Sequence, residues 1–162
     1  MSQLAFITGA TSGIGRATAE ALAAKGYRLA LAARNGEKLE DTAEDFRMKY
    51  NAEVTVWPLD VRDRDAIRAT ADKVMETCGV PDVLVNNAGV VDDAFLLMLA
   101  PESLDRSLDV NVKGYFYCAQ AATLKMFKAR TGAIVNISSV SSKMALPGQS
   151  VYAATKGAIN SM

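Results

Sequence analysis

Short apolar runs alternate along the chain with longer segments in which apolar residues recur every three or four positions. The short runs predict strands that are buried on both faces, and the longer segments predict amphipathic helices. Repeated strand, helix, strand units indicate an α/β fold, a doubly wound parallel sheet with helices on both faces. The predicted strands are residues 3–8, 28–33, 53–59, 82–86 and 133–138, and the predicted helices are residues 14–25, 36–50, 63–78, 101–129 and 150–162.

In a sheet of this kind, ligands bind at the carboxyl ends of the strands. The sequence places residues with special backbone or polar chemistry after each predicted strand. These segments are Gly9 to Gly15, Ala33-Arg34, Asp60-Val61, Asn86 to Gly89, and Ser138-Ser139. They mark one edge of the sheet as the predicted site.

The segment Thr-Gly-Ala-Thr-Ser-Gly-Ile-Gly at residues 8–15 lies between the first strand and the first helix. Gly9 permits a tight turn, Gly13 lets a diphosphate approach the backbone, and Gly15 lets the helix pack closely on the strand. The helix start, with Ser12 as a candidate N-cap, offers N–H groups and a positive dipole end to an anion. Three glycines alone would also fit an ordinary loop, but the strand before and the helix after them favour a dinucleotide site.

The end of the second strand selects the cofactor. An acidic residue about twenty residues past the glycines binds the ribose of NAD, whereas a nearby arginine accommodates the 2′-phosphate of NADP. Here Ala33 is neutral and Arg34 follows it. Arg16, at the start of the first helix, is a second candidate cation. The alternative is that both arginines are solvated surface charges; we expect NADP(H).

Tyr152 and Lys156 are four residues apart in a predicted helix and therefore share one face. A nearby ammonium favours the phenolate form of tyrosine, which suits a general acid or base. Taken alone, the same pair describes a packed aromatic ring beside a lysine whose stem is buried. The assignment therefore depends on the other motifs.

Composition excludes several classes of protein. Eighteen Lys and Arg balance 18 Asp and Glu, which gives no overall field for nucleic acid or an anionic membrane. No apolar stretch is long enough to span a bilayer, and no secretory signal precedes the first strand, so we expect a cytoplasmic protein. The chain has no histidine, which excludes imidazole catalysis and the usual zinc sites, and we expect no metal. Cys78 and Cys118 are expected to be buried free thiols.

Five sequence motifs occur in order along the chain. They are TGATSGIG at 8–15, LDV at 59–61, NNAG at 86–89, NV-x-G at 111–114, and SS-V at 138–140 with Y-x-A-x-K from Tyr152. Together these motifs resemble the short-chain dehydrogenase/reductases over residues 1–162. Within that family, residues 92–98 and the loop ending at Gln149 are most similar to the 3-oxoacyl-[acyl-carrier-protein] reductases.

The resemblance implies a Rossmann-type fold and a catalytic set of four residues. Tyr152 would protonate the carbonyl oxygen, Lys156 would assist it and hold the nicotinamide ribose, and Ser139 would hydrogen-bond the carbonyl as charge develops. Asn111 would complete a water relay to Lys156; the alternative is a polar residue that kinks a long helix. The implied cofactor contacts are Gly9, Thr11, Ser12, Gly13, Ile14, Gly15, Arg16, Arg34, Asp60, Val61, Asn87, Ala88 and Gly89, together with Tyr152 and Lys156.

The implied activity is NADPH-dependent reduction of a ketone or 3-oxoacyl thioester to the hydroxy form. Members of the family continue beyond the Tyr-Lys helix into further strands and a substrate lobe. We therefore expect residues 1–162 to be a single, partial NADP-binding domain of a longer enzyme, with doubtful activity of its own. The alternatives are a naturally short chain that uses partners and a non-catalytic dinucleotide-binding or scaffold module.

The predicted helix 101–129 carries two apolar stripes. One stripe should face the sheet, and the other suits a partner subunit, so we expect a homodimer or homotetramer; ordinary core packing is the alternative. The first stripe is Leu108, Val112, Tyr115, Ala119, Ala122 and Met126, and the second is Phe116, Thr123 and Phe127.

Overall fold

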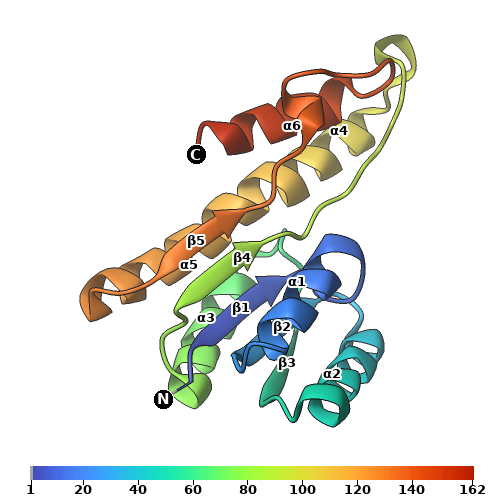
Figure 1. Ribbon diagram of the computed structural model, residues 1–162. Helices are drawn as coiled ribbons and strands as arrows, with labels where there is room; N and C mark the ends of the chain where they lie inside the picture. The colour runs from blue at the N-terminus through green and yellow to red at the C-terminus, as the bar shows by residue number, and fades with distance from the viewer. Residues whose placement is uncertain (1) are drawn as a thin grey trace.

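A single parallel sheet of five strands forms the centre of the protein, which we describe from a computed structural model (Figure 1). The structure describes residues 2–162, so the part of the domain prediction that falls on Met1 lies outside it. The spatial order of the strands is β3-β2-β1-β4-β5. The strands are β1 (Leu4–Thr8), β2 (Arg28–Ala33), β3 (Val54–Pro58), β4 (Val83–Asn86) and β5 (Ala133–Asn136).

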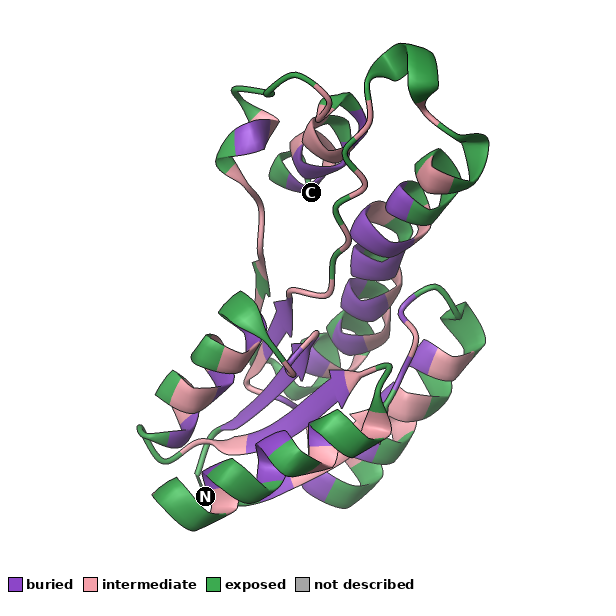
Figure 2. Cartoon of the chain, turned by 90° about the vertical axis from the view of Figure 1, so that its right-hand side faces the viewer, coloured by how far each residue is buried: buried purple, intermediate pink, exposed green. Residues whose placement is uncertain are grey.

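Helices cover both faces of this sheet, because successive side chains of each strand point to opposite sides. In β1, Ala5 and Ile7 pack with the helices α1 and α2, whereas Leu4 and Phe6 pack with α3 and α5. Figure 2 shows the resulting buried layer along the strands and the inner sides of the helices. The predicted doubly wound parallel fold is confirmed. The four helices are α1 (Gly13–Ala23), α2 (Gly36–Tyr50), α3 (Arg64–Cys78) and α5 (Gly114–Ala129).

The register of the sheet brings the strand ends to one edge. Thr8 at the end of β1 lies beside Ala32 of β2, and Asn86 at the end of β4 lies beside Asn136 of β5. The loops that follow the strands therefore meet along this edge, where the sequence predicts the site.

The predicted helix over residues 101–129 is not continuous. It consists of α4 (Pro101–Leu108), a wider π-helical turn η2 (Asp109–Lys113), and α5. Asn111 lies within the π turn, and its side chain bonds both the backbone N–H and the carbonyl of Val90. A side chain bonded to another segment at such a turn accounts for the interruption.

The last helix is shorter than predicted. The helix α6 (Ser150–Asn160) ends before Met162, and the Ser161 N–H bonds the Ala158 carbonyl beyond its last turn. Two short 3₁₀ turns, η1 (Leu96–Met98) and η3 (Val140–Ser142), lie in the loops that lead into α4 and α6.

Two further predictions concern buried and exposed apolar groups. Cys78 and Cys118 are buried free thiols, as predicted. On α5 the stripe with Tyr115 and Ala119 is buried, whereas Phe116 and Phe127 are exposed. The predicted pairing of this second stripe with another subunit stays a prediction. Among residues 2–162, no helix is both long and apolar enough to cross a bilayer.

Candidate functional site

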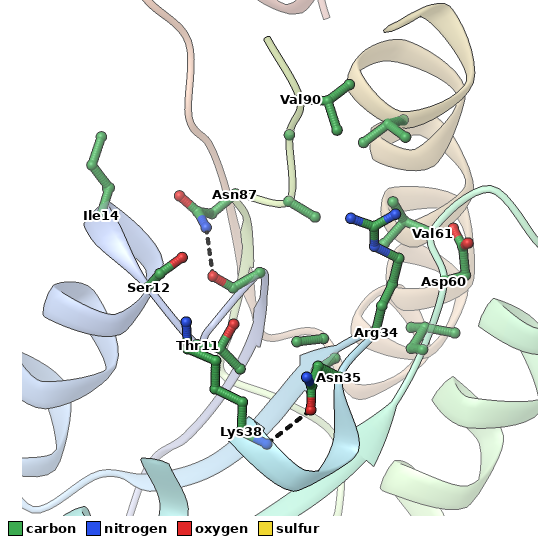
Figure 3. A pocket seen from close by; sticks show the side chains of 17 residues that line it. Thr11, Ser12, Ile14, Arg34, Asn35, Lys38, Asp60, Val61, Asn87 and Val90 are labelled. Carbon is green, nitrogen blue, oxygen red and sulfur yellow. Dashed lines mark hydrogen bonds between the residues drawn. The ribbon is translucent and has the colours of Figure 1, made fainter. Parts of the chain in front are cut away.

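A cavity of about 540 Å³ opens at the carboxyl ends of the strands (Figure 3). Its walls come from the loops after β1, β2, β3 and β4, and from Val110 of η2. Most of the predicted cofactor contacts line it, which the sheet register explains. The predicted residues that line the cavity are Gly9, Thr11, Ser12, Ile14, Arg34, Asp60, Val61, Asn87, Ala88 and Gly89.

The glycine turn after β1 is built as its spacing predicts. Gly9 and Gly13 have positive φ angles of 67° and 53°, which other residues adopt only at a cost. A Cβ on Gly15 would collide with the Gly9 carbonyl oxygen and with Asn87 Nδ2, whereas a Cβ on Gly13 would meet open space. Gly15 thus permits the close contact between helix and loop, and Gly13 leaves the backbone open to a ligand. Ser12 occupies the N-cap position with an extended backbone, but its side chain makes no capping hydrogen bond.

Thr8 and Asn87 fasten the loop after β4 to the glycine turn. The Thr8 hydroxyl oxygen accepts the backbone N–H groups of Asn87 and Ala88 at 3.0 and 3.1 Å. Asn87 Nδ2 donates to the carbonyls of Thr8 and Gly9, both at 3.1 Å. Hydrogen bonds from Thr8 and from Asn87 thus hold together the two loops that line this part of the cavity.

The cations at the rim are Arg34 and Lys38, not Arg34 and Arg16. Arg16 is absent from the lining; its guanidinium bonds Asp45 of α2 at 2.9 Å and lies over the Phe46 ring. In this structure a carboxylate on the neighbouring helix thus holds Arg16 outside the cavity lining, and its contact with the cofactor stays a prediction. Lys38 was missed because it lies one turn inside α2, beyond the motif.

The side chain of Asn35 sets the start of α2 and hence the place of Lys38. Asn35 Oδ1 caps the helix by accepting the Lys38 N–H at 2.9 Å. Figure 3 shows Lys38 directed toward Thr11 and Ser12, and Arg34 extended on the side of Val61. Within residues 2–162, the Arg34 guanidinium makes no ion pair, and neither does the Lys38 ammonium.

Asp60 lines the cavity on the same side as Arg34 and Val61 (Figure 3). Hydrogen bonds from the Arg62 guanidinium at 2.6 to 3.1 Å lower the pKa of the Asp60 carboxyl. Because both carboxylate oxygens accept from Arg62, that arginine is committed to Asp60.

Lys156 lies beside the Gly89 end of the cavity, although it does not line the cavity itself. It is only 3% exposed, and a Cβ on Gly89 would lie 3.9 Å from its Nζ. Burial lowers the pKa of Lys156 to about 8. Its Nζ lies 5.9 Å from the centroid of the Tyr152 ring, and Tyr152 is half-buried. The helix α6 thus brings this pair together, as the spacing predicts.

Ser139 lies at the start of η3. Its Oγ accepts the Ser141 N–H at 3.1 Å, which leaves the hydroxyl hydrogen available for donation. Ser138 instead donates to the Lys156 backbone carbonyl at 3.2 Å. The two adjacent serines therefore differ: the hydroxyl of Ser138 bonds α6, and that of Ser139 bonds only within its own loop.

Asn111 is fully buried beside the same end of the cavity. Its Oδ1 accepts the Val90 N–H at 2.8 Å, and its Nδ2 donates to the Val90 carbonyl at 2.8 Å and to Thr155 Oγ1 at 3.3 Å. The side chain thus holds the loop after β4 against α6. The implied water relay stays a prediction.

The residues present fit a dinucleotide cofactor. The glycine turn offers the open backbone N–H groups of a helix start, which suit a diphosphate. Two cations at the end of β2 suit a further phosphate on the ribose. Within residues 2–162, no cluster of metal-ligating side chains is present.

The family profile described as "short chain dehydrogenase" matches residues 3–162. The chain belongs to the short-chain dehydrogenase family. The predicted resemblance is therefore confirmed, over all but the first two residues of the chain.

Named relatives are more than one third identical to the chain over the aligned residues. The chain is 39% identical over 160 residues to the 3-oxoacyl-[acyl-carrier-protein] reductase FabG of Staphylococcus aureus. This match covers 98% of the chain and 65% of the relative. The chain is 40% identical over 162 residues to the 2-(R)-hydroxypropyl-CoM dehydrogenase of Xanthobacter autotrophicus, with the same coverage. The chain thus spans slightly less than two thirds of the length of these relatives.

Solved structures of the family superpose closely on the chain. An alcohol dehydrogenase from the archaeon Thermococcus sibiricus, complexed with 5-hydroxy-NADP, has a TM-score of 0.95 and 33% identity, and the match covers 99% of this chain and 68% of that one. An NAD⁺-bound xylitol dehydrogenase has a TM-score of 0.94 and 32% identity, with coverage of 98% and 61%. The shared fold thus serves proteins that bind either dinucleotide.

Proposed function

We propose that the chain forms the dinucleotide-binding and proton-donating part of an NADPH-dependent reductase that acts on a ketone or 3-oxoacyl thioester. The observation that carries this proposal is the position of the buried Lys156 amine at the Gly89 end of the cavity, one helical turn from Tyr152. The Lys156 amine is thus close both to the cavity and to the ring of the candidate proton donor.

The preference for NADPH rests on charge at the end of β2. Ala33 carries no carboxylate to repel a 2′-phosphate, and both Arg34 and Lys38 line the cavity. Both cations are exposed and lack ion pairs within residues 2–162, so their donors are available. An Asp or Glu in place of Ala33 would favour NADH instead.

The four residues implied by the resemblance have separate tasks. When bound, NADPH supplies the hydride. The Tyr152 phenol gives its proton to the substrate carbonyl oxygen, and the Ser139 hydroxyl donates a hydrogen bond to that oxygen as negative charge develops. Lys156 supplies positive charge beside the phenol, and Asn111 fixes the Val90 backbone at the end of the cavity.

Two named relatives support a proposal for the substrate class. The Staphylococcus aureus relative is a 3-oxoacyl-[acyl-carrier-protein] reductase, and we propose a 3-oxoacyl thioester as the first substrate to test. The Xanthobacter relative is a 2-(R)-hydroxypropyl-CoM dehydrogenase, so we propose small ketones and secondary alcohols as the second class to test. Both classes present a carbonyl or hydroxyl to the same proton donor.

Replacing Tyr152 with Phe tests the proposal. We expect the Tyr152→Phe variant of the full-length protein to lose at least roughly 100-fold in turnover of acetoacetyl thioester, because the ring is kept and only the acid is removed. NADPH affinity, measured by fluorescence titration, should stay unchanged. Tyr117→Phe, the same substitution on α5, is the control for loss of a phenol elsewhere.

A non-catalytic dinucleotide-binding module is the alternative. It predicts NADPH binding by the wild-type protein with no turnover of any carbonyl substrate. Turnover that survives in Tyr152→Phe would instead assign the acid to another group.

A further inference from the structure

Lys156 has a second tyrosine beside it, which the motif does not include. The Lys156 Nζ donates to the hydroxyl oxygen of Tyr115 at 3.1 Å and to the Ile137 carbonyl oxygen at 2.7 Å. An ammonium has three donors, so one remains for another partner. Tyr115 starts α5, Ile137 directly follows β5, and Lys156 is on α6, so three separate elements meet at one nitrogen.

Tyr115 is held firmly in this position. Its side chain is 2% exposed, and its hydroxyl donates to the same Ile137 carbonyl at 3.1 Å. Its backbone carbonyl accepts Asn86 Nδ2 at 3.3 Å. The preceding Gly114 packs against Val61 so tightly that a Cβ there would lie 3.0 Å from the Val61 carbonyl oxygen. The phenol is thus fixed from both sides.

The two tyrosines differ in their relation to the lysine. Nζ lies 4.9 Å from the Tyr115 ring centroid and 5.9 Å from that of Tyr152. It bonds the Tyr115 hydroxyl, whereas within residues 2–162 no hydrogen bond joins it to Tyr152. Tyr115 is therefore the present partner of the lysine, and Tyr152 is the neighbour that the motif pairs with it.

We propose that Tyr115 is a positioning residue, which holds the Lys156 amine between its own hydroxyl and the Ile137 carbonyl and stabilises the protonated form of that amine. The hydrogen bonds themselves are independent of the proposed function; their consequence for catalysis rests on it, because it requires Lys156 to serve Tyr152.

The electrostatic surroundings agree with this role. Burial raises the pKa of Tyr115 above its usual value, with smaller contributions from Tyr152 and Cys118, so its phenol is neutral and has a lone pair for the ammonium. Burial pulls the pKa of Lys156 down to about 8. A hydrogen bond to the charged form opposes that effect. The titratable groups that face the amine are Tyr115 from α5 and Tyr152 from α6, and within residues 2–162 no carboxylate pairs with it.

The direct test is a titration of Lys156 followed by its ¹³Cε NMR resonance, assigned by its loss in Lys156→Arg. In Tyr115→Phe, we expect the pKa of Lys156 to fall by about one pH unit, because the ammonium loses one of its two acceptors. Tyr117→Phe, the same change two residues along α5 on a ring that faces Arg64, should leave the titration unchanged. An unchanged Lys156 titration in Tyr115→Phe, or an equal change in both variants, would overturn the proposal.

A second readout connects the inference to catalysis. In the full-length protein, the pH at which turnover of acetoacetyl thioester is half-maximal should move with the Lys156 titration in Tyr115→Phe, and stay in place in Tyr117→Phe. A shifted titration with a fixed pH profile would contradict the catalytic consequence while leaving the positioning intact. A shifted titration in a protein without any turnover would instead count against the proposed function alone.

Discussion

The two ends of the cavity differ in what determines their structure, which is backbone geometry at one end and side-chain contacts at the other. Around β1 and α1 the backbone forms the surface: Gly9 and Gly13 have positive φ angles, and the side chains of Thr8 and Asn87 fasten the turn by hydrogen bonds to backbone groups. Around β5 and α6 the central group is a side chain: the Lys156 amine donates to the Tyr115 hydroxyl and to the Ile137 carbonyl, which belong to other segments. Backbone geometry depends on a few glycines, whereas a side chain's partners depend on how distant segments pack. The backbone therefore fixes the geometry of the first end, whereas single side-chain substitutions can change the hydrogen bonds of the second.

The largest expected effect comes from breaking the backbone end with Gly15→Ala. The new Cβ would overlap the Gly9 carbonyl oxygen and Asn87 Nδ2, both of which are fixed by hydrogen bonds. We expect the free energy of unfolding, measured with urea, to fall by about 3 kcal/mol. Gly157→Ala in α6 is the matched control, because its Cβ meets open space and alanine favours a helix by about 0.5–1 kcal/mol. Equal stability of the two variants would contradict the tight packing inferred for Gly15.

A smaller loss is expected when the cation at the end of β2 is removed. Arg34→Ala should weaken NADPH binding by roughly 10-fold to 100-fold, since a charge-assisted hydrogen bond contributes about 1.5–3 kcal/mol. NADH, which lacks the 2′-phosphate, should bind with little change. Arg16→Ala is the control, because Arg16 bonds Asp45 and lies outside the cavity lining. Isothermal titration of both cofactors checks this, and an equal loss for NADPH and NADH would overturn the assignment of Arg34.

The same contrast explains what the sequence could predict. The order of strands and helices, the glycine turn and the residues after each strand follow from periodicity and from the rule that parallel strands present their carboxyl ends at one edge. Ala33 and Arg34 could also be identified directly, because they stand at the end of the second predicted strand, where the residue type distinguishes NAD from NADP.

Side-chain partners could not be predicted in this way. Tyr115 fits the buried stripe of its helix, and nothing in its spacing indicates that its hydroxyl meets an amine 41 residues later. Arg16 lies in the first turn of α1, directly after the glycine turn, but the carboxylate that binds it belongs to Asp45 on α2. The π turn at Asp109–Lys113 breaks an apolar pattern that runs on as if the helix were continuous. Each of these depends on tertiary contact rather than on local pattern.

The smallest expected effect sharpens the comparison at the side-chain end. Lys156→Met should raise the free energy of unfolding at pH 7 by about 1–2 kcal/mol, because the buried ammonium is costly and the Tyr115 hydroxyl still donates to Ile137 without it. The pKa of Lys156 is lowered in the folded protein to about 8, so between about pH 8 and the usual lysine value the unfolded chain binds more protons. The wild type therefore gains stability from this group as the pH rises through that window.

The gain in the free energy of unfolding of Lys156→Met over the wild type should thus be largest below pH 8 and decline toward pH 10.5. Urea denaturation of the wild type and of Lys156→Met from pH 6 to pH 10 measures the difference between their free energies of unfolding. The contributions of titrating groups that the two proteins share cancel in this difference. Lys125→Met is the control, because Lys125 is a half-exposed surface residue paired with Asp72. A Lys156→Met variant that is less stable than the wild type at pH 7 would mean that the amine holds α5, α6 and the residue after β5 together. In that case the side-chain end would be as rigid as the backbone end, and the contrast between them would fail.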